Sequence, residues 1–315
     1  MKWQRSSTMT VMMSAMTPLL KASRRPFASR ILPMQKRFLR AAVLTFAVAV
    51  LTPAAAFAQL AATNPAGAAI GHVHINATDL EVQQRFWTTL GGTIVQREKL
   101  TLVQFPGIYV ILRKQDPTGG TVGSRLNHFG FLVRDFAGSV AKWKTAGLNW
   151  EPVVNPQVGQ GFLMGPDNVR VEIYEDTSIA APMRMHHIHL LVPNPPEAQQ
   201  WYGQHFGAVP GKRLGGIGVN RTEFDTVNVP GTEITLSRTT EALVPTKGRS
   251  VDHIGFEVSD INAFVAKLRA AGIKTDGEVR SSTNASGLQI VYITDPWGTE
   301  IEITQGLKST PPATP

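Results

Sequence analysis

Two kinds of hydrophobic pattern alternate between residues 70 and 306. Four stretches carry apolar residues at helical spacing, begin at Asp or Asn and end at or just before a glycine: 79–90, 135–146, 194–206 and 260–271. Strand-like alternation follows them, for example at 101–105, 108–112, 226–229 and 233–237. An apolar strand-like run also precedes each helical stretch. The pattern therefore predicts four β-α-β-β-β units.

Three short motifs occur twice, in the same order. The first is HVHI at 72–75 and HIHL at 187–190; the second is NHFGFLVRD at 127–135 and DHIGFEVSD at 252–260; the third is GPDNVRVE at 165–172 and DPWGTEIE at 295–302. Such self-similarity indicates duplicated structural units. We expect an α+β fold with two tandem domains, residues 70–178 and 184–306, each made of two β-α-β-β-β units.

Residues 1–58 differ from the rest of the chain in charge. They contain nine of the 31 Lys and Arg residues and no Asp or Glu, and they end in an uncharged run from Ala41 to Ala58. A basic stretch, an apolar run and a final Ala-x-Ala predict a secretory signal segment cleaved after Ala58. The protein is therefore expected to be exported, to the periplasm or beyond.

Three details of this leader leave alternatives open. The uncharged run is nearly long enough to be an uncleaved membrane anchor. A start at Met34 would give a compact signal for the general secretory route. A start at Met1 would include Arg24 and Arg25, a pair typical of the twin-arginine route.

The remainder of the chain is close to neutral, because its 22 basic residues face 23 acidic ones. This balance gives no charge argument for a nucleic-acid partner. The chain contains no cysteine, which excludes disulfides and thiolate metal ligands. The small and polar segments 59–69 and 307–315 are expected to be a flexible linker and a flexible tail.

Histidine is the residue type that points to chemistry. Six of the eight histidines fall on predicted strands: His72, His74, His128, His187, His189 and His253. Each half offers two histidines on its first strand, another on its fifth strand and a glutamate, Glu172 or Glu302, on its last. These residue types suffice for a site of two histidines and one carboxylate, an arrangement that binds divalent metals.

The motifs and their order resemble the vicinal oxygen chelate superfamily, which includes glyoxalase I, extradiol dioxygenases, fosfomycin-modifying enzymes and bleomycin-binding proteins. The resemblance covers essentially all of residues 70–306. It implies paired β-α-β-β-β units that form an open, cup-shaped sheet around a divalent metal. Carried over residue by residue, it implies one triad in each half, of which the second is the favoured site: His72, His128 and Glu172, then His187, His253 and Glu302.

The second half is more similar to extradiol dioxygenases than to glyoxalase I. Glyoxalase I usually adds a carboxylate on an earlier strand, and segments 108–113 and 233–238 place no clear carboxylate there. Tyr292 stands ten residues before Glu302, where the dioxygenases have a substrate-binding tyrosine, whereas the first half has Phe162. The usual acid-base histidine is absent, and His189 is the candidate to replace it.

The resemblance implies an exported metal-dependent enzyme that binds a small substrate through vicinal oxygens. Fe²⁺ or Mn²⁺ is the favoured metal, with Zn²⁺ or Ni²⁺ as alternatives. Dioxygenase chemistry is the leading expectation, followed by a glyoxalase-like isomerase or lyase, and a non-catalytic ligand-binding protein is the competing class. The expected partner is the small substrate, with no lasting membrane partner after cleavage. The sequence leaves open whether each cup-shaped sheet is completed within one chain or by assembly of two copies.

Overall fold

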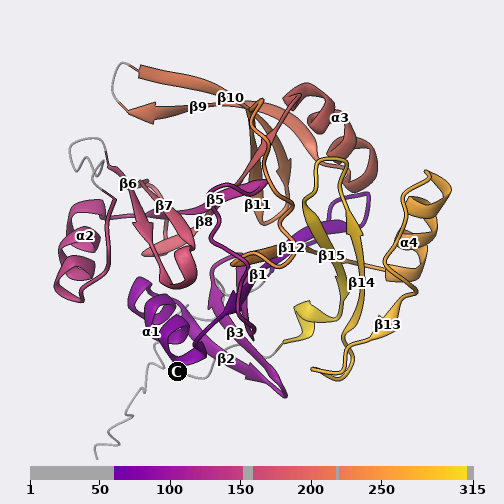
Figure 1. Cartoon of the computed structure of the whole chain (residues 1–315), viewed down its shortest axis with the longest axis horizontal. Coiled ribbons are helices and arrows are strands. Elements are labelled where there is room, and N and C mark those ends of the chain that lie inside the picture. The colour runs from indigo at the N-terminus through magenta and orange to yellow at the C-terminus, as the bar shows by residue number, and fades with distance from the viewer. Residues whose placement is uncertain (1–59, 152–158, 218–219, 311–315) are drawn as a thin grey trace, which may run out of the picture. The chain divides into compact units, whose positions relative to one another are not determined.

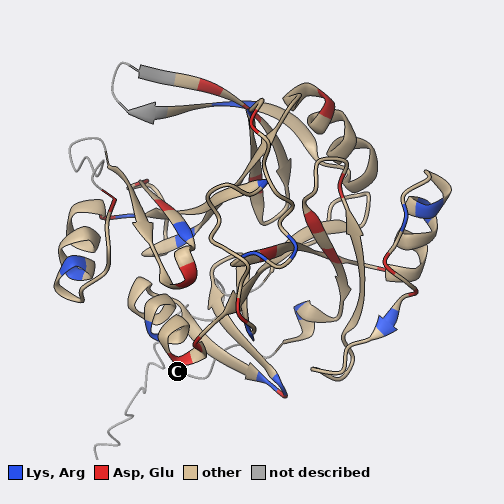
Figure 2. Ribbon diagram, viewed as in Figure 1, with Lys and Arg blue, Asp and Glu red and all other residues tan. Residues whose placement is uncertain are grey.

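The computed structural model describes residues 60–151, 159–217 and 220–310. The predicted export segment 1–58 lies outside these ranges. Within them, no helix is long and apolar enough to cross a membrane. Figure 2 shows basic and acidic residues interspersed along the ribbon, as the near-neutral charge of this part requires.

Four successive modules each begin with a strand and a helix (Figure 1). The first contains β1 (Ala68–Ala77), α1 (Leu80–Leu90), β2 (Thr93–Arg97), β3 (Leu100–Phe105) and β4 (Ile108–Lys114). The second contains β5 (Leu126–Val133), α2 (Phe136–Thr145), β6 (Gln160–Met164), the short helix η3 (Pro166–Asn168) and β7 (Arg170–Glu175). The third contains β8 (Met183–Val192), α3 (Pro195–Phe206), β9 (Val209–Ile217), β10 (Asn220–Val229) and β11 (Thr232–Arg238). The fourth contains β12 (Val251–Val258), α4 (Ile261–Ala270), β13 (Arg280–Ser281), β14 (Gln289–Thr294), β15 (Glu300–Gln305) and the short helix η4 (Leu307–Ser309).

The β-α-β-β-β order is confirmed in the first, third and fourth modules. The second module has two strands after its helix in the described residues, and an isolated bridge between Trp150 and Leu163 stands where a further strand was expected. The mixed helix-and-sheet fold predicted from the sequence is therefore correct.

Polar caps start three of the four helices as predicted. The side chains of Asp79, Asp135 and Asp260 accept hydrogen bonds from backbone N–H groups of the first turn. Asn194 makes no such bond; Pro195 and Pro196 fill the first two helical positions and have no N–H groups to satisfy.

The strands form two sheets, and each sheet combines modules from both halves of the sequence. The 8-stranded sheet has the order β13-β14-β15-β12-β1-β4-β3-β2, and the 7-stranded sheet has the order β6-β7-β5-β8-β11-β10-β9. The first module thus pairs with the fourth, and the second with the third, through the antiparallel pairs β1–β12 and β5–β8. Residues 70–178 and 184–306 therefore do not each build a sheet of their own.

This pairing follows from the edges of the modules. The first strand of every module would be an unpaired edge if the module stood alone, and an exposed edge favours pairing with another strand. All four first strands offer such an edge, so the internal repeat is compatible with more than one pairing. In the fold, only residues 176–182 connect β7 to β8, and the second and third modules pair directly.

The helices pack their apolar faces against the sheets. Trp87 of α1 stacks on Phe129 of β5 at 5.6 Å between ring centroids, and Phe206 of α3 lies 4.1 Å from Phe256 of β12. All four side chains are fully buried, which stabilises the fold by about 1.5–3 kcal/mol per large apolar side chain. Trp87 comes from the module whose strands lie in the 8-stranded sheet and Phe129 lies in the 7-stranded sheet, so one core joins both sheets.

Both segments expected to be flexible pack against the fold where they are described. In segment 59–69, Leu60 is buried, and in segment 307–315, Leu307 is fully buried in the same apolar cluster. The Glu257 carboxylate accepts hydrogen bonds from three consecutive backbone N–H groups at the start of η4. The expectation of a free linker and tail was wrong for these residues, because their leucines fill space beside β3 and β4.

Candidate metal centres

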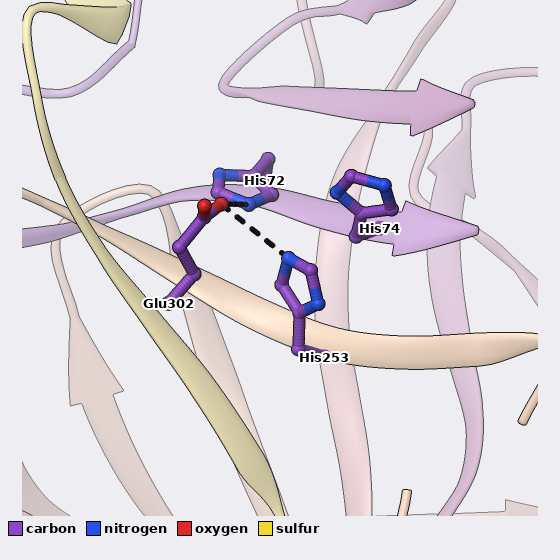
Figure 3. Close-up of side chains that lie close together, drawn as sticks. All are labelled: His72, His74, His253 and Glu302. Atoms are coloured by element: carbon purple, nitrogen blue, oxygen red, sulfur yellow. Dashed lines mark ion pairs between the residues drawn. The ribbon is translucent and has the colours of Figure 1, made fainter. Parts of the chain in front are cut away.

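The register of the 8-stranded sheet gathers four ligand-type side chains, which we call site A: His72, His74, His253 and Glu302. His74 pairs with His253 across β1 and β12, and Glu302 of β15 lies opposite Gly255 of β12. The ligand atoms of all four residues lie within 4.8 Å of one another, and all four residues are buried. Figure 3 shows the Glu302 carboxylate between the rings of His72 and His253.

Gly255 explains why the repeated His-x-Gly-Phe motif contains a glycine. A Cβ atom at this position would lie 1.9 Å from Cε1 of His72, a distance that no real contact allows. At the corresponding Gly130, a Cβ atom would lie 2.5 Å from Cε1 of His187. The missing side chain therefore leaves the space in which each first-strand histidine lies across the sheet.

Site A leaves several buried nitrogen atoms without a hydrogen bond. His72 Nε2 lies 2.9 Å and His253 Nε2 lies 3.4 Å from Glu302 Oε2. Neither contact has hydrogen-bond geometry, so both ring nitrogens of His72, both of His74 and Nε2 of His253 have no partner. An unsatisfied buried polar group costs about 1–3 kcal/mol. Imidazole nitrogens and a carboxylate oxygen are ligands for divalent metals, so this donor set fits such an ion.

Asp252 supports the site from behind. Its Oδ1 lies 2.6 Å from His253 Nδ1, and its Oδ2 accepts a hydrogen bond from the Gly248 N–H and lies 3.2 Å from Arg113 Nη2. A carboxylate on the second nitrogen of a ligating histidine fixes the ring orientation and raises its basicity. Asp252 therefore orients His253 toward Glu302.

The surroundings shift the pKa values of the site A residues in opposite directions. Burial lowers the pKa of His253, but the carboxylates of Asp252 and Glu302 outweigh it and raise that pKa to about 9. Burial raises the pKa of Glu302, but the close rings of His253 and His72 hold it well below its usual range. Burial, and then the charge on His253, lower the pKa of His74 well below its usual range. His74 is therefore neutral at physiological pH.

The 7-stranded sheet contains an equivalent cluster, which we call site B: His128, His187, His189 and Glu172. The three histidines can place ligand atoms within 4.8 Å of one another. Glu172 Oε2 lies 3.0 Å from His128 Nε2 and 3.2 Å from His187 Nε2. The two sites thus share residue types and strand positions.

Site B differs from site A because neighbouring side chains form hydrogen bonds with its histidine ring nitrogens. His128 Nδ1 bonds Asn127 Oδ1 at 2.8 Å, and His189 Nε2 bonds Ser237 Oγ at 2.7 Å. His187 Nε2 lies 3.2 Å from His128 Nε2, and its Nδ1 lies 3.0 Å from Nδ1 of His186. None of the ring nitrogens of site B is among the unpaired buried atoms of the described residues.

The pKa values of site B follow the same contacts. Burial is the largest cause that lowers the pKa of His187, to about 3, and burial likewise lowers the pKa of His189 well below its usual range. Burial raises the pKa of Glu172, but hydrogen bonds from His128 and His187 bring it well below normal. His187 and His189 are therefore neutral at physiological pH.

All six ligands named from the sequence lie in these two sites, but their predicted grouping was wrong. His187 does not join His253 and Glu302, and His72 does not join His128 and Glu172, because the sheets pair the first module with the fourth.

Two further histidines differ from the sequence interpretation. His189 was expected to act beside Tyr292, yet it belongs to site B, and His74 takes the corresponding place in site A. His186, which the sequence analysis did not single out, is only partly exposed and contacts His187 from the position of a bulge in β8.

Tyr292 connects site A to a pocket of about 330 Å³. Its hydroxyl donates a hydrogen bond to Glu302 Oε1 at 2.5 Å, and its ring lies 5.3 Å from that of His253. Burial is the main cause that raises the pKa of Tyr292, and the Glu302 charge adds to it, so the hydroxyl stays protonated. The pocket is lined by Arg113, Gln115, Lys247, Gly248, Asp252, Asp276, Arg280, Tyr292 and Glu300.

At site B the residue in the place of Tyr292 is Phe162, which is covered. The Arg170 guanidinium lies 3.7 Å above the Phe162 ring and binds both carboxylate oxygens of Glu151, at 2.5 and 2.7 Å. A pocket of about 540 Å³ lies near this site and includes His186 and Tyr174 among its lining residues. Leu132, which also lines this pocket, occupies the repeat position of Glu257, the residue that binds η4 in the other sheet.

Comparisons with known proteins agree with this architecture. Residues 184–303 match the profile of the Glyoxalase/Bleomycin resistance protein/Dioxygenase superfamily. No curated protein sequence matches the chain significantly.

Two solved structures illustrate the shared fold. Glyoxalase I from Zea mays aligns with a TM-score of 0.59 at 16% identity, over 77% of this chain and 94% of the maize chain. A proposed dioxygenase from Bacillus subtilis aligns with a TM-score of 0.56 at 15% identity, over 81% of this chain and 87% of that chain. Identities this low show the fold alone. The profile match therefore places residues 184–303 in the Glyoxalase/Bleomycin resistance protein/Dioxygenase superfamily, and the solved structures show that the chain shares their fold.

Proposed function

We propose that this protein is a divalent-metal-dependent enzyme whose working centre is site A, acting on a small substrate bound through two adjacent oxygen atoms. The observation that carries the proposal is the set of unpartnered ring nitrogens of His72, His74 and His253 beside the Glu302 carboxylate. The pocket at Tyr292 gives a small molecule a place beside this set. A bound divalent metal would supply Lewis-acid polarisation of the substrate oxygens.

Two residues of the chain are suited to manage protons. The Tyr292 hydroxyl donates its one proton to Glu302, which fixes its position, so its oxygen can accept a hydrogen bond from a substrate hydroxyl. His74 is neutral and has both ring nitrogens free, so it can accept a proton from a substrate hydroxyl. Burial of His74 limits exchange of that proton with water.

The role of His74 distinguishes two reaction classes. If His74 serves as an acid-base group, three protein ligands remain, and an octahedral ion then has room for a chelated substrate and a second reactant. This arrangement favours ring-cleaving dioxygenation of a catechol, the leading candidate. If His74 is a fourth ligand, its position among the donors of site A favours a redox-neutral isomerase or lyase.

The test is turnover by the purified protein loaded without oxygen with Fe²⁺ or Mn²⁺. Catechols are screened with an oxygen electrode, and 2-oxo and 2-hydroxy carbonyl compounds are screened by absorbance or NMR. Oxygen uptake matched to catechol loss supports the dioxygenase, and turnover without oxygen uptake supports the redox-neutral class. His72→Ala is expected to abolish either activity, whereas His187→Ala, at the matched position of site B, retains it.

Two results would contradict the enzyme proposal. Binding of the compounds without turnover under any loading condition would support the ligand-binding class of this superfamily instead. Retention of full activity in His72→Ala would place the chemistry outside site A.

The location of the protein is a separate proposal. The basic and apolar pattern of residues 36–58 supports export with cleavage after Ala58. Fractionation of the source cells and N-terminal sequencing test it: a periplasmic or secreted chain that begins at Gln59 is expected, and an uncleaved chain in the membrane fraction contradicts it.

A further inference from the structure

The charged residues that line the pocket beside site A are unequally paired. Lys247 Nζ lies 2.9 Å from Glu300 Oε1 and 3.4 Å from Asp276 Oδ2, so acidic neighbours already balance its charge. Arg113 donates hydrogen bonds from Nε and Nη2 to Asn76 Oδ1, and its Nη2 also forms an ion pair with Asp252 Oδ2. No hydrogen bond is formed by its Nη1 within the described part of the chain.

Arg280 is the cation of this pocket that has no acidic partner. It belongs to the short strand β13 and is exposed, and its guanidinium carbon lies 5.4 Å from the centroid of the Tyr292 ring. Across the described ranges its side chain forms no ion pair and no hydrogen bond, and its guanidinium group lies over the face of that ring. Stacking on an aromatic ring orients a guanidinium group and leaves its edge N–H groups free to bind a ligand.

Tyr292 connects both arginines to site A. Burial raises the pKa of its hydroxyl, and the positive charges of Arg113 and Arg280 each oppose that rise, so both guanidinium groups act on the same pocket. The same hydroxyl bonds Glu302, a ligand-type residue of the site. A molecule that reaches the site through this pocket therefore passes the free N–H groups of both arginines.

We propose that the substrate of site A carries an oxyanion, most simply a carboxylate, which Arg280 and Arg113 bind while its adjacent oxygen atoms face the metal ligands. This inference rests on the proposed function of site A and specifies its substrate class. Arginine matches a carboxylate because its planar N–H fork can form two parallel bonds to the two oxygens. A pocket of about 330 Å³ limits the substrate to about one ring with short substituents.

The matched positions of site B lack this arrangement. Ser237 stands where β4 has Arg113, since His189 pairs with Thr235 in the same register that pairs His74 with Ile111. Arg170, in the place of Glu300, is already bound to Glu151. At these two positions, therefore, site B offers no free guanidinium group.

Binding of two ligands that differ only in the carboxylate tests the inference. The purified protein is loaded with Zn²⁺, which prevents redox turnover, and catechol and 3,4-dihydroxybenzoate are titrated by calorimetry. The carboxylate ligand is expected to bind at least about 10-fold more tightly, because a charge-assisted, bidentate contact is among the strongest hydrogen-bonded pairs. Arg280→Gln should reduce that preference to less than about 3-fold with catechol affinity unchanged.

Arg85→Gln is the matched control, because Arg85 is an exposed arginine of α1 whose loss changes the net charge equally. It should retain the full preference. Equal affinity for the two ligands in the wild type, or a preference that survives in both Arg280→Gln and Arg113→Gln, would overturn the inference while site A remains a metal-dependent ligand site. A protein that retains no metal and binds neither ligand would overturn both the inference and the proposed function.

Discussion

Sites A and B have the same ligand residue types at the same positions of an internal repeat, yet they differ in what surrounds those ligands. In site A, five ring nitrogens are buried without a hydrogen bond. In site B, hydrogen bonds with Asn127, His186 and Ser237 occupy one ring nitrogen of each equivalent histidine. A complete set of ligand residues is therefore not sufficient to define a metal centre; the neighbours decide whether the ligand atoms are free.

Two substitutions within the repeat account for much of this difference. Asp252 in site A corresponds to Asn127 in site B, so only His253 has a carboxylate on its Nδ1. Tyr292 corresponds to Phe162, so the hydroxyl that bonds Glu302 has no counterpart at this position of site B, where the Tyr174 hydroxyl lies near Glu172 instead. Site A thereby has a more basic histidine, and the two sites reach their pockets through different residues, Tyr292 in site A and His186 and Tyr174 in site B.

The largest expected difference concerns the two glutamates. Glu302→Gln keeps the side-chain shape but removes the charge, and the affinity of the protein for Mn²⁺ or Zn²⁺ should fall by at least about 100-fold, more than loss of an outer contact. Glu172→Gln should change it by less than about 3-fold, since distant sites act independently. Metal titration with a competing chelator measures both. Equal losses in the two variants would remove the distinction between the sites.

Asp252→Asn places beside His253 in site A the residue type that Asn127 places beside His128 in site B. Loss of the carboxylate lowers the basicity of His253, and metal affinity should fall by about 10–100-fold. The reverse change, Asn127→Asp, should leave the affinity of site A unchanged. If Asp252→Asn binds metal as the wild type does, within about 3-fold, the outer carboxylate does not distinguish the two sites.

The glycines beside the first-strand histidines give an effect on both stability and metal. Gly255→Ala places a Cβ atom against the His72 ring and should destabilise the fold by about 1–3 kcal/mol. Gly130→Ala, against His187, should cost a similar amount. Only Gly255→Ala should also lower the metal content, because it displaces a ligand of site A. Chemical denaturation and elemental analysis measure the two effects, and a Gly255→Ala protein with full metal would contradict the placement of His72.

Tyr292→Phe is expected to have the smallest effect. It gives site A the aromatic residue of site B and removes one hydrogen bond, so substrate-analogue affinity or turnover should fall by up to about 10-fold. Metal affinity should stay within about 3-fold of the wild type. The control Phe162→Tyr should gain no activity. A large loss of metal in Tyr292→Phe would mean that the hydroxyl supports the ligands rather than the substrate.

Much of the fold could be predicted from the sequence, because helical and strand periodicity are local properties. The caps at Asp79, Asp135 and Asp260 and the motifs around His128 and His253 specify modules that recur in the structure. The second module is the exception, because it has two strands after its helix in the described residues, and residues 152–158 of this module lie outside them. The residue types of the sites were also correct, since alternation on a strand places histidines two residues apart on one face.

The grouping of those residues could not be predicted, for a physical reason. Because the modules are repeats, a first-strand histidine such as His72 meets a fifth-strand histidine and a glutamate whichever module it pairs with. The choice depends on long-range pairing of strand edges, which leaves no local signal. The free state of the site A nitrogens and the packing of Leu60 and Leu307 are likewise tertiary properties.

The metal content of three proteins, purified without a histidine tag, tests the central claim most directly: the wild type, His72→Ala and His187→Ala. The two variants change matched positions of the repeat, so general effects on the fold should be similar. We predict one metal ion per chain in the wild type and in His187→Ala, and none in His72→Ala. Loss of the metal in His187→Ala with retention in His72→Ala would contradict the account, because His187 would then complete the centre in place of His72.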